Sequence, residues 1–254
     1  MRPTDHLRRA LSLTATLATL ASLATTAAIA QQPPASIDAV LHQLDLASTS
    51  FRSAEANLRI DMFERVVQDT STECGVIYYL RQSSSIQMDS KTSAVSGNSC
   101  PDTSFTAPAS RIADYKNGTL QMFEPLANHL TILSAGANQG QIESFLTLGF
   151  GASGRDLAKA WTITEQGTET LNDGSKEVAT VKLKLVAKDP AILKNLSYVL
   201  IWVDPARGLS LKQQFFTPAG DYRTTYFTNI RYNQKVDTAT FAIKTNKQTQ
   251  VDRH

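Results

Sequence analysis

The sequence has few of the side chains that most often carry catalysis or bind metals. Among its 254 residues are only two cysteines and four histidines, His6, His42, His129 and His254. None of these histidines has a second histidine, a cysteine or a carboxylate at the spacing of a metal-binding motif. A nucleophile elbow, a phosphate-binding P-loop and a Cys-x-x-Cys pair are also missing. We therefore expect no bound metal, no cofactor and no enzymatic activity.

The sequence also has little net charge. Its formal charge is +2, and residues 1–30 hold three arginines and one acidic residue, which leaves 22 basic and 22 acidic residues elsewhere. Proteins that bind nucleic acid through their electrostatic field need clustered basic residues. The near-neutral remainder therefore argues against nucleic-acid binding.

Residues 1–30 have the pattern of a secretory signal peptide. Arg8 and Arg9 precede an uncharged stretch that ends in Ala28-Ile29-Ala30, a cleavage pattern. The stretch is long enough to span a membrane, so an uncleaved anchor is the alternative. We expect cleavage near Ala30, a linker at 31–35, no lipid anchor because no cysteine follows, and a soluble periplasmic protein.

Cys74 and Cys100 are the two cysteines of this expected exported chain. Export favours a single disulfide between them, and two free thiols are the alternative. The bond would close a loop of roughly 25 residues and stabilise the fold by about 3 kcal/mol.

Hydrophobic patterning after residue 35 is mainly that of β-strands, with short helices. Ser36 is a candidate N-cap for an amphipathic helix at 36–49. Asn117-Gly118 marks a tight hairpin. A turn is expected at 69–74 and a polar insertion or long loop at 90–110. The expected strands are 53–68, 75–82, 86–89, 111–116, 119–123, 129–134, 161–166, 177–187, 197–203, 209–216 and 222–232.

An apolar helix is expected at 139–150, followed by a helical turn at 156–161 that Ser153 caps. Between them, 149–154 spells G-x-G-x-x-G, which in a dinucleotide site follows a strand inside a βαβ unit. Here a helix precedes it. We therefore interpret the glycines as a sharp turn, able to act as a hinge, between two helical segments.

The strand at 75–82 is apolar on both faces, with Tyr78 on one and Ile77 and Tyr79 on the other, which ends in Arg81. A guanidinium at such a rim offers five donors and needs acceptors. The chain has more large apolar side chains than one sheet face needs, and these either fill a core or line a ligand cavity. The candidates are Ile77, Tyr78, Tyr79, Phe145, Leu146, Leu148, Phe150, Tyr198, Trp202, Phe215 and Phe216.

The order of these features resembles the LolA family of periplasmic lipoprotein carriers. Besides the export signal, the first helix and the long strand, the resemblance depends on Tyr79-Leu80-Arg81, the hairpin at 113–120, Pro125, the apolar helical segment and the ending at 236–241. It covers roughly residues 36–245 and leaves 246–254 as a C-terminal tail. Two departures are Gln82, where the family commonly has proline, and the long segment at 90–110.

The resemblance implies a mainly β fold with short helices, an incomplete antiparallel β-barrel of about 10 or 11 strands closed by a helical lid. Its apolar cavity would receive the acyl chains of lipoproteins or related envelope lipids, and Arg81 would hold the lid closed. The implied partners are an inner-membrane lipoprotein-releasing transporter and an outer-membrane acceptor. Alternatives on the same fold are a lipid- or peptide-sensing envelope regulator and an outer-membrane acceptor domain. We expect a monomer.

Overall fold

The structure is a computed structural model that describes residues 36–254 apart from 83–84, 98, 101–108, 137–138 and 236–237. Every described helix and strand lies in one compact unit, Pro34–His254. The expected signal peptide and linker lie outside the described residues.

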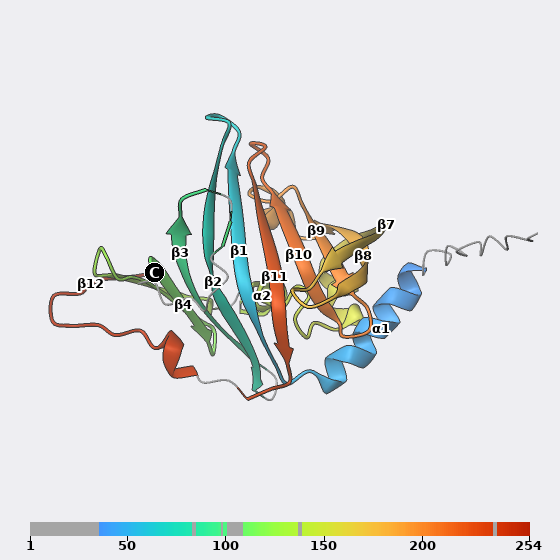
Figure 1. Cartoon of the computed structure of the whole chain (residues 1–254), viewed down its shortest axis with the longest axis horizontal. Helices are drawn as coiled ribbons and strands as arrows, with labels where there is room; N and C mark the ends of the chain where they lie inside the picture. Colours follow the sequence, from blue (N-terminus) through green and yellow to red (C-terminus); the bar gives the residue numbers. More distant parts are fainter. Residues whose placement is uncertain (1–35, 83–84, 98, 101–108, 137–138, 236–237) are drawn as a thin grey trace, which may run out of the picture. The chain divides into compact units, whose positions relative to one another are not determined.

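One twelve-stranded sheet is the framework of this unit (Figure 1). Its order is β12-β6-β5-β4-β3-β2-β1-β11-β10-β9-β8-β7, so β12 and β7 are the edges and the sheet is not closed. Neighbouring strands are antiparallel, except that β12 pairs with β6 in parallel. The predicted mainly β, open antiparallel fold is confirmed. The strands are β1 (Ser53–Glu64), β2 (Asp69–Gln82), β3 (Ser85–Val95), β4 (Arg111–Lys116), β5 (Thr119–Glu124), β6 (His129–Ser134), β7 (Trp161–Asn172), β8 (Glu177–Ala187), β9 (Tyr198–Asp204), β10 (Leu209–Phe216), β11 (Tyr222–Tyr232) and β12 (Gln250–Arg253).

Helices α1 (Ile37–Ser50), α2 (Gln139–Leu146) and α3 (Gly154–Ala160) pack on one face of the sheet, which we call the inner face. The helix α4 (Pro190–Leu193) follows β8, and the 3-10 helix η2 (Thr238–Phe241) follows β11. The expected caps are present: the Ser36 hydroxyl accepts from the Ala39 amide at 3.3 Å, and the Ser153 hydroxyl accepts from the Asp156 amide at 3.1 Å. The side-chain oxygens satisfy amides that the first helical turn leaves unpaired.

Several predicted boundaries were wrong. Residues 69–74 are strand rather than turn, because they pair with β1 as far as Glu64 opposite Asp69. Residues 90–95 continue β3 instead of opening a loop, and 101–108 lie outside the described chain. The predicted tail contains β12, which raises the strand number to twelve. The apolar helix ends at Leu146 rather than at residue 150.

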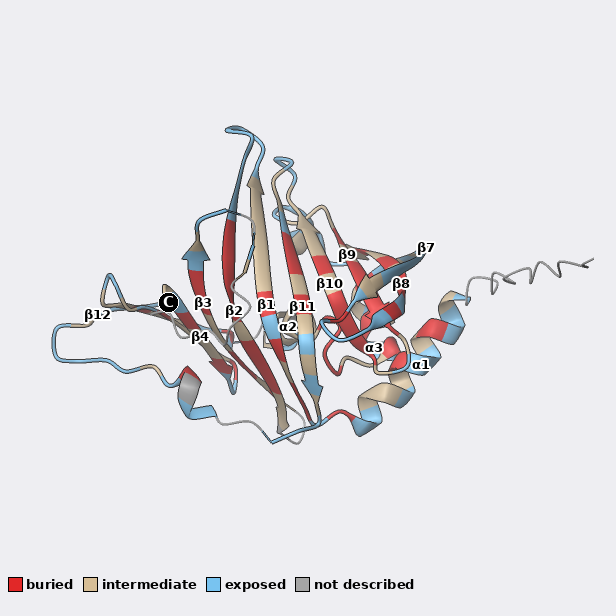
Figure 2. Cartoon of the chain, in the orientation of Figure 1, coloured by how far each residue is buried: buried red, intermediate tan, exposed pale blue. Residues whose placement is uncertain are grey.

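Two apolar clusters occupy the inner face. The buried stretches of strands such as β2 and β10 are red in Figure 2. The first joins α1 and α3 to β8 and β9 through residues such as Leu44, Leu157 and Ile201. The second lies over β1, β2 and β11. Leu148 belongs to the first cluster and Phe150 to the second, and both are fully buried. We call α2, α3 and the residues between them the helical cover. The segment after α2 therefore anchors this cover to both halves of the core.

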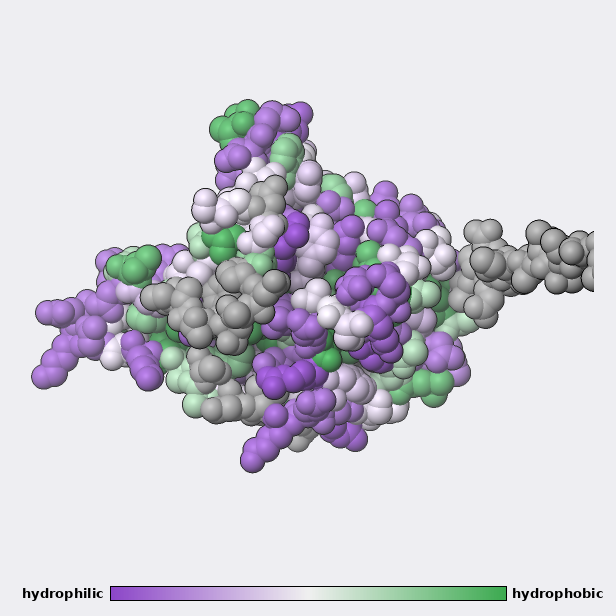
Figure 3. All heavy atoms as spheres, in the orientation of Figure 1, coloured by the Kyte–Doolittle hydropathy of each residue, from purple (hydrophilic) through white to green (hydrophobic). Residues whose placement is uncertain are grey.

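A disulfide and an aromatic contact stabilise the outer face of the sheet. Cys74 and Cys100 form a disulfide with their Cα atoms 5.6 Å apart. The ring of Phe241 in η2 stacks on Tyr78 with a centroid distance of 6.2 Å. Hydrophilic atoms cover much of the face seen in Figure 3, whereas hydrophobic atoms mark the tip of the β1–β2 hairpin, where Val66 is 90% exposed.

Candidate functional site

A pocket of about 490 Å³ lies between α2, α4 and the strands β10 and β11. Its volume is within the roughly 300–1,000 Å³ of small-ligand sites. Three of the predicted site residues, Phe145, Leu146 and Phe215, line it together, although they are up to 70 positions apart. The remaining lining residues are Ala191, Ile192, Asn195, Leu196 and Arg223.

Strand pairing places the one cation of this lining. Phe215 of β10 lies opposite Arg223 of β11, and the guanidinium carbon is 5.0 Å from the Phe215 ring centroid. Partial desolvation by the surrounding protein lowers the pKa of Arg223, an effect that Tyr79 and Glu73 oppose. Arginine stays charged in proteins even so. The pocket thus combines apolar walls with a single permanent positive charge.

Four other predicted site residues are packed into the core instead of lining this pocket. Ile77 and Tyr79 belong to the second cluster, and Leu148 and Phe150 are fully buried. Tyr79 stacks on Phe150 with ring centroids 4.4 Å apart, and Phe150 meets Phe227 edge-on at 4.8 Å. Burial raises the pKa of Tyr79, so its hydroxyl is neutral at physiological pH. These aromatic contacts fix the segment after α2 against the sheet.

Arg81 contacts the same segment. Its Nη2 donates a hydrogen bond to the Gly151 carbonyl, and its guanidinium carbon lies 5.6 Å from the ring centroid of Phe51. Gly151 has a φ of +79°, and a Cβ there would lie 2.5 Å from the Phe51 ring. Within the described chain, the buried Nε of Arg81 has no hydrogen-bond partner.

The glycines of the G-x-G-x-x-G sequence serve this close approach. Gly149 has a φ of +72°, and a Cβ there would lie 2.2 Å from the Cβ of Ser210 on β10. The sequence follows α2 and not a strand, so it lacks the setting of a dinucleotide site. Positive φ at Gly149 and Gly151 also explains why α2 ends before residue 150.

A second pocket, of about 530 Å³, has a more polar lining. Arg81 and Trp161 both border it, and each has a buried N–H group without a partner in the described chain. Charged groups of both signs surround it, including Glu143, Asp156 and Lys188. Ile192 borders both pockets, so they are neighbours.

Trp202 lies on the outer face of the sheet and lines neither of the two pockets. On β9 the alternate residues Ile201 and Val203 point into the first core cluster, so Trp202 faces outward. Its Nε1 donates to Glu169 at 2.5 Å, and Lys212 Nζ lies 4.2 Å from its ring centroid. Tyr198 and Phe216 stack on each other on this same outer face, at 4.4 Å. Strict alternation along β9 could have separated these residues from the inner face.

The sequence analysis did not predict Arg223, Ile192 and Leu196 as pocket-lining residues. Alternation along 222–232 places Arg223 on the face of Phe227, a signal present in the sequence. Asp189-Pro190 is a helix-start signal, since Asp189 caps α4 by accepting from the Ala191 amide at 2.7 Å. That α4 lies beside α2 could not be read from local sequence.

The described residues contain no group of three or more His, Cys, Asp or Glu residues placed to hold a metal ion. No helix in the described part of the chain is long and apolar enough to cross a membrane.

No protein-family model and no curated protein matches the chain. Similar solved structures include an uncharacterized conserved protein from Thermus thermophilus, with 12% identity and a TM-score of 0.49 over 85% of this chain and 98% of that one. A chain of the Pseudomonas aeruginosa MucA/MucB complex has 14% identity and a TM-score of 0.47 over 82% of this chain and 61% of that one. A LolA superfamily protein from Nitrosomonas europaea has 13% identity and a TM-score of 0.36 over 83% and 98%. One of these neighbours is thus a member of the superfamily that the sequence resembles.

Proposed function

We propose that the protein is a non-enzymatic periplasmic carrier that shelters the acyl chains of lipoproteins or related envelope lipids beneath α2. The observation that supports this most directly is the 490 Å³ pocket, whose walls are apolar side chains of α2, α4 and β10. Burying an acyl chain gains about 0.8 kcal/mol per methylene group. An apolar pocket can therefore hold such cargo without many polar contacts.

In this proposal Arg81 is the latch of the helical cover. Its hydrogen bond to the Gly151 carbonyl ties β2 to the segment between α2 and α3. A hydrogen bond from a charged donor contributes roughly 1.5–3 kcal/mol. Burial of a few methylene groups offsets that amount, so cargo itself can drive the opening.

The proposed route begins at an inner-membrane lipoprotein-releasing transporter and ends at an outer-membrane acceptor. Because the pocket holds its cargo by apolar burial, release requires either an opened cover or a better apolar cavity in the acceptor. Either route to release is open to a protein that binds the acyl chains reversibly and makes no covalent bond to them.

The test is a titration of the protein lacking residues 1–30 with a triacylated lipopeptide and with the same peptide lacking its acyl chains. We expect binding of the acylated form alone. Leu146→Lys, which puts a charge into the pocket, should weaken it at least tenfold. Leu126→Lys is the matched control, since Leu126 is 88% exposed in the β5–β6 turn. A folded protein that binds neither peptide would refute the proposal.

A further inference from the structure

Arg223 stands out among the residues that line the apolar pocket. It lies on the inner face of β11, between Met62 of β1 and Phe215 of β10 in the strand register. The guanidinium lies over the Phe215 ring, and both side chains border the same pocket. Arg223 nevertheless remains accessible to solvent, so a ligand in the pocket can reach it.

This guanidinium has no carboxylate partner within 4.0 Å in the described part of the chain, unlike Arg59, Arg111, Arg207 and Arg231. The acidic residue that acts on it, Glu73, already binds Arg111 at 3.4 Å and accepts from the Thr92 hydroxyl at 2.9 Å. Tyr79 faces it as a neutral phenol. Among the described residues, the contact found for this guanidinium is with the Phe215 ring, which leaves its N–H donors available to a ligand.

A planar guanidinium matches the two oxygens of a carboxylate or the oxygens of a phosphate. The apolar side chains that line the pocket include Phe215, whose ring this guanidinium overlies, and also Leu196 and Phe145. We infer that the pocket selects acyl chains that carry an anionic head, a carboxylate or a phosphate, which Arg223 binds. This inference rests on the proposed acyl-chain function, and among the proposed cargoes it favours envelope lipids with an anionic head over lipoproteins, whose acyl chains are attached through uncharged links.

The test compares four ligands that share one dodecyl chain: dodecanoate, dodecyl phosphate, 1-dodecanol and dodecylammonium. Each ligand is titrated against the protein lacking residues 1–30 with the neutral fluorophore N-phenyl-1-naphthylamine bound, at concentrations below those at which the ligand forms micelles or separates from water. The loss of fluorescence measures displacement. At least one anion should bind tenfold or more tightly than dodecylammonium. The order of the two anions tells whether a carboxylate or a phosphate fits better.

Arg223→Gln should weaken the preferred anion about tenfold and leave 1-dodecanol within twofold, and Arg223→Glu should favour dodecylammonium. Arg231→Gln is the control on the same strand, because Arg231 pairs with Glu55 on the outer face. Equal binding of all four ligands, unchanged by Arg223→Gln, would overturn the inference and leave acyl binding intact. No displacement by any of the four would instead reject acyl binding itself.

Discussion

At the scale of single residues, Arg81 joins the sheet to its helical cover by one side-chain hydrogen bond and by its contact with Phe51. Arg81→Leu keeps an apolar stem over Phe51 but removes the donor to the Gly151 carbonyl. The cover should then open more often, and amide exchange in α2 and in 147–152 should accelerate about tenfold or more. Hydrogen exchange followed by mass spectrometry measures this directly.

The matched control for that variant is Arg155→Leu. The Arg155 side chain on α3 is 89% exposed, and its Nε lies 3.6 Å from Asp45 Oδ2, which is a long distance for an ion pair. An exposed pair of this kind contributes little. Exchange in α2 should be unchanged by Arg155→Leu. Equal exchange in both variants would mean that Arg81 does not hold the cover.

Asp89 is a second residue with a measurable effect. It lies opposite Asp114 in the β3–β4 register and is only 2% exposed. Burial and the neighbouring Asp114 raise the pKa of Asp89 to about 7, although the Gln87 amide donates to it at 2.9 Å. An unfolded aspartate titrates near pH 3.9. The folded chain therefore holds a proton that the unfolded chain lacks between about pH 4 and 7, and stability falls as pH rises through that window.

Asp89→Asn should remove this loss. Urea unfolding at pH 5 and pH 8 should show that the wild type loses about 1–2 kcal/mol more than the variant over this interval, because one pKa unit corresponds to about 1.4 kcal/mol. Asp69→Asn, at the exposed start of β2, should keep the wild-type slope. An identical pH slope for Asp89→Asn and the wild type would show that the pair is not linked to folding.

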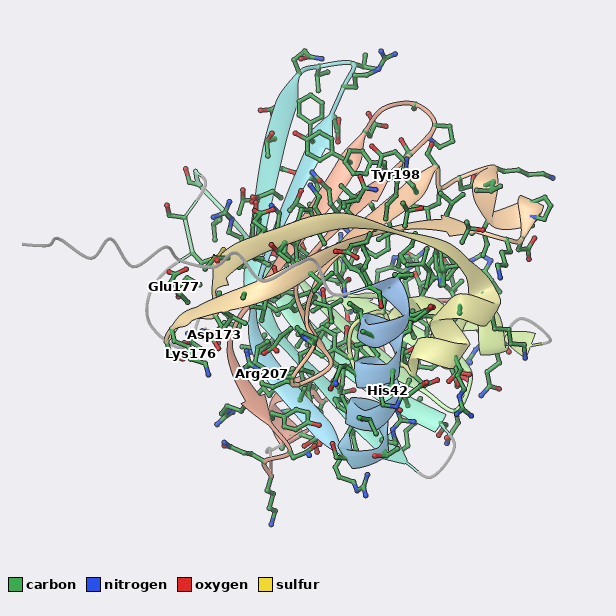
Figure 4. All side chains as sticks on the ribbon, turned by 90° about the vertical axis from the view of Figure 1, so that its right-hand side faces the viewer. His42, Asp173, Lys176, Glu177, Tyr198 and Arg207 are labelled. Carbon is green, nitrogen blue, oxygen red and sulfur yellow. A yellow bond between two sulfur atoms is a disulfide. The ribbon has the colours of Figure 1, made fainter. Side chains whose placement is uncertain are left out.

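At the scale of elements, two turns are joined by one arginine (Figure 4). Arg207, after β9, donates from Nε to Asp204 at 2.6 Å and from Nη2 to Asp173, after β7, at 3.0 Å. Burial disfavours the Asp173 charge, but hydrogen bonds from Ser175, Lys176 and Arg207 outweigh it and lower the pKa of Asp173 to about 2. This stabilisation is fully present above about pH 4 and is lost as the pH falls towards 2.

Arg207→Ala should cost about 3 kcal/mol in the free energy of unfolding at pH 7, because it leaves two buried carboxylates without their partner. Equilibrium urea denaturation measures the loss. Arg155→Ala breaks the pair with Asp45, in which the arginine side chain is 89% exposed, and should cost less than about 1 kcal/mol. Similar costs for the two substitutions would contradict the role assigned to the Arg207 network.

At the scale of the whole molecule, local signals predicted the fold well. Ser36, Ser153 and Asn117-Gly118 each mark an element boundary that the structure contains. What could not be predicted depends on distant partners. The polar residues 69–74 form a strand because β1 supplies their hydrogen bonds, and β12 exists because β6, more than a hundred residues earlier, offers an edge.

The site was predictable in part for the same reason. Alternation identified the inner-face residues of β2, and the surplus of apolar side chains pointed to Phe145, Leu146 and Phe215. Trp202 faces outward because it alternates with Ile201 and Val203 along β9, and a surplus of apolar residues does not distinguish the two faces of a strand. The neighbourhood of α2, α4 and β11 that makes the pocket depends on how the chain folds back across the sheet.

The most direct measurement is photo-crosslinking of the protein lacking residues 1–30 with a lipopeptide whose acyl chain carries a terminal diazirine. Mass spectrometry of the digest then locates the attached chain. We expect saturable labelling in Gln139–Leu146 and Leu209–Phe216, which an unmodified lipopeptide suppresses. Saturable labelling confined to the outer face around Trp202, or no saturable labelling of a folded protein, would contradict this expectation.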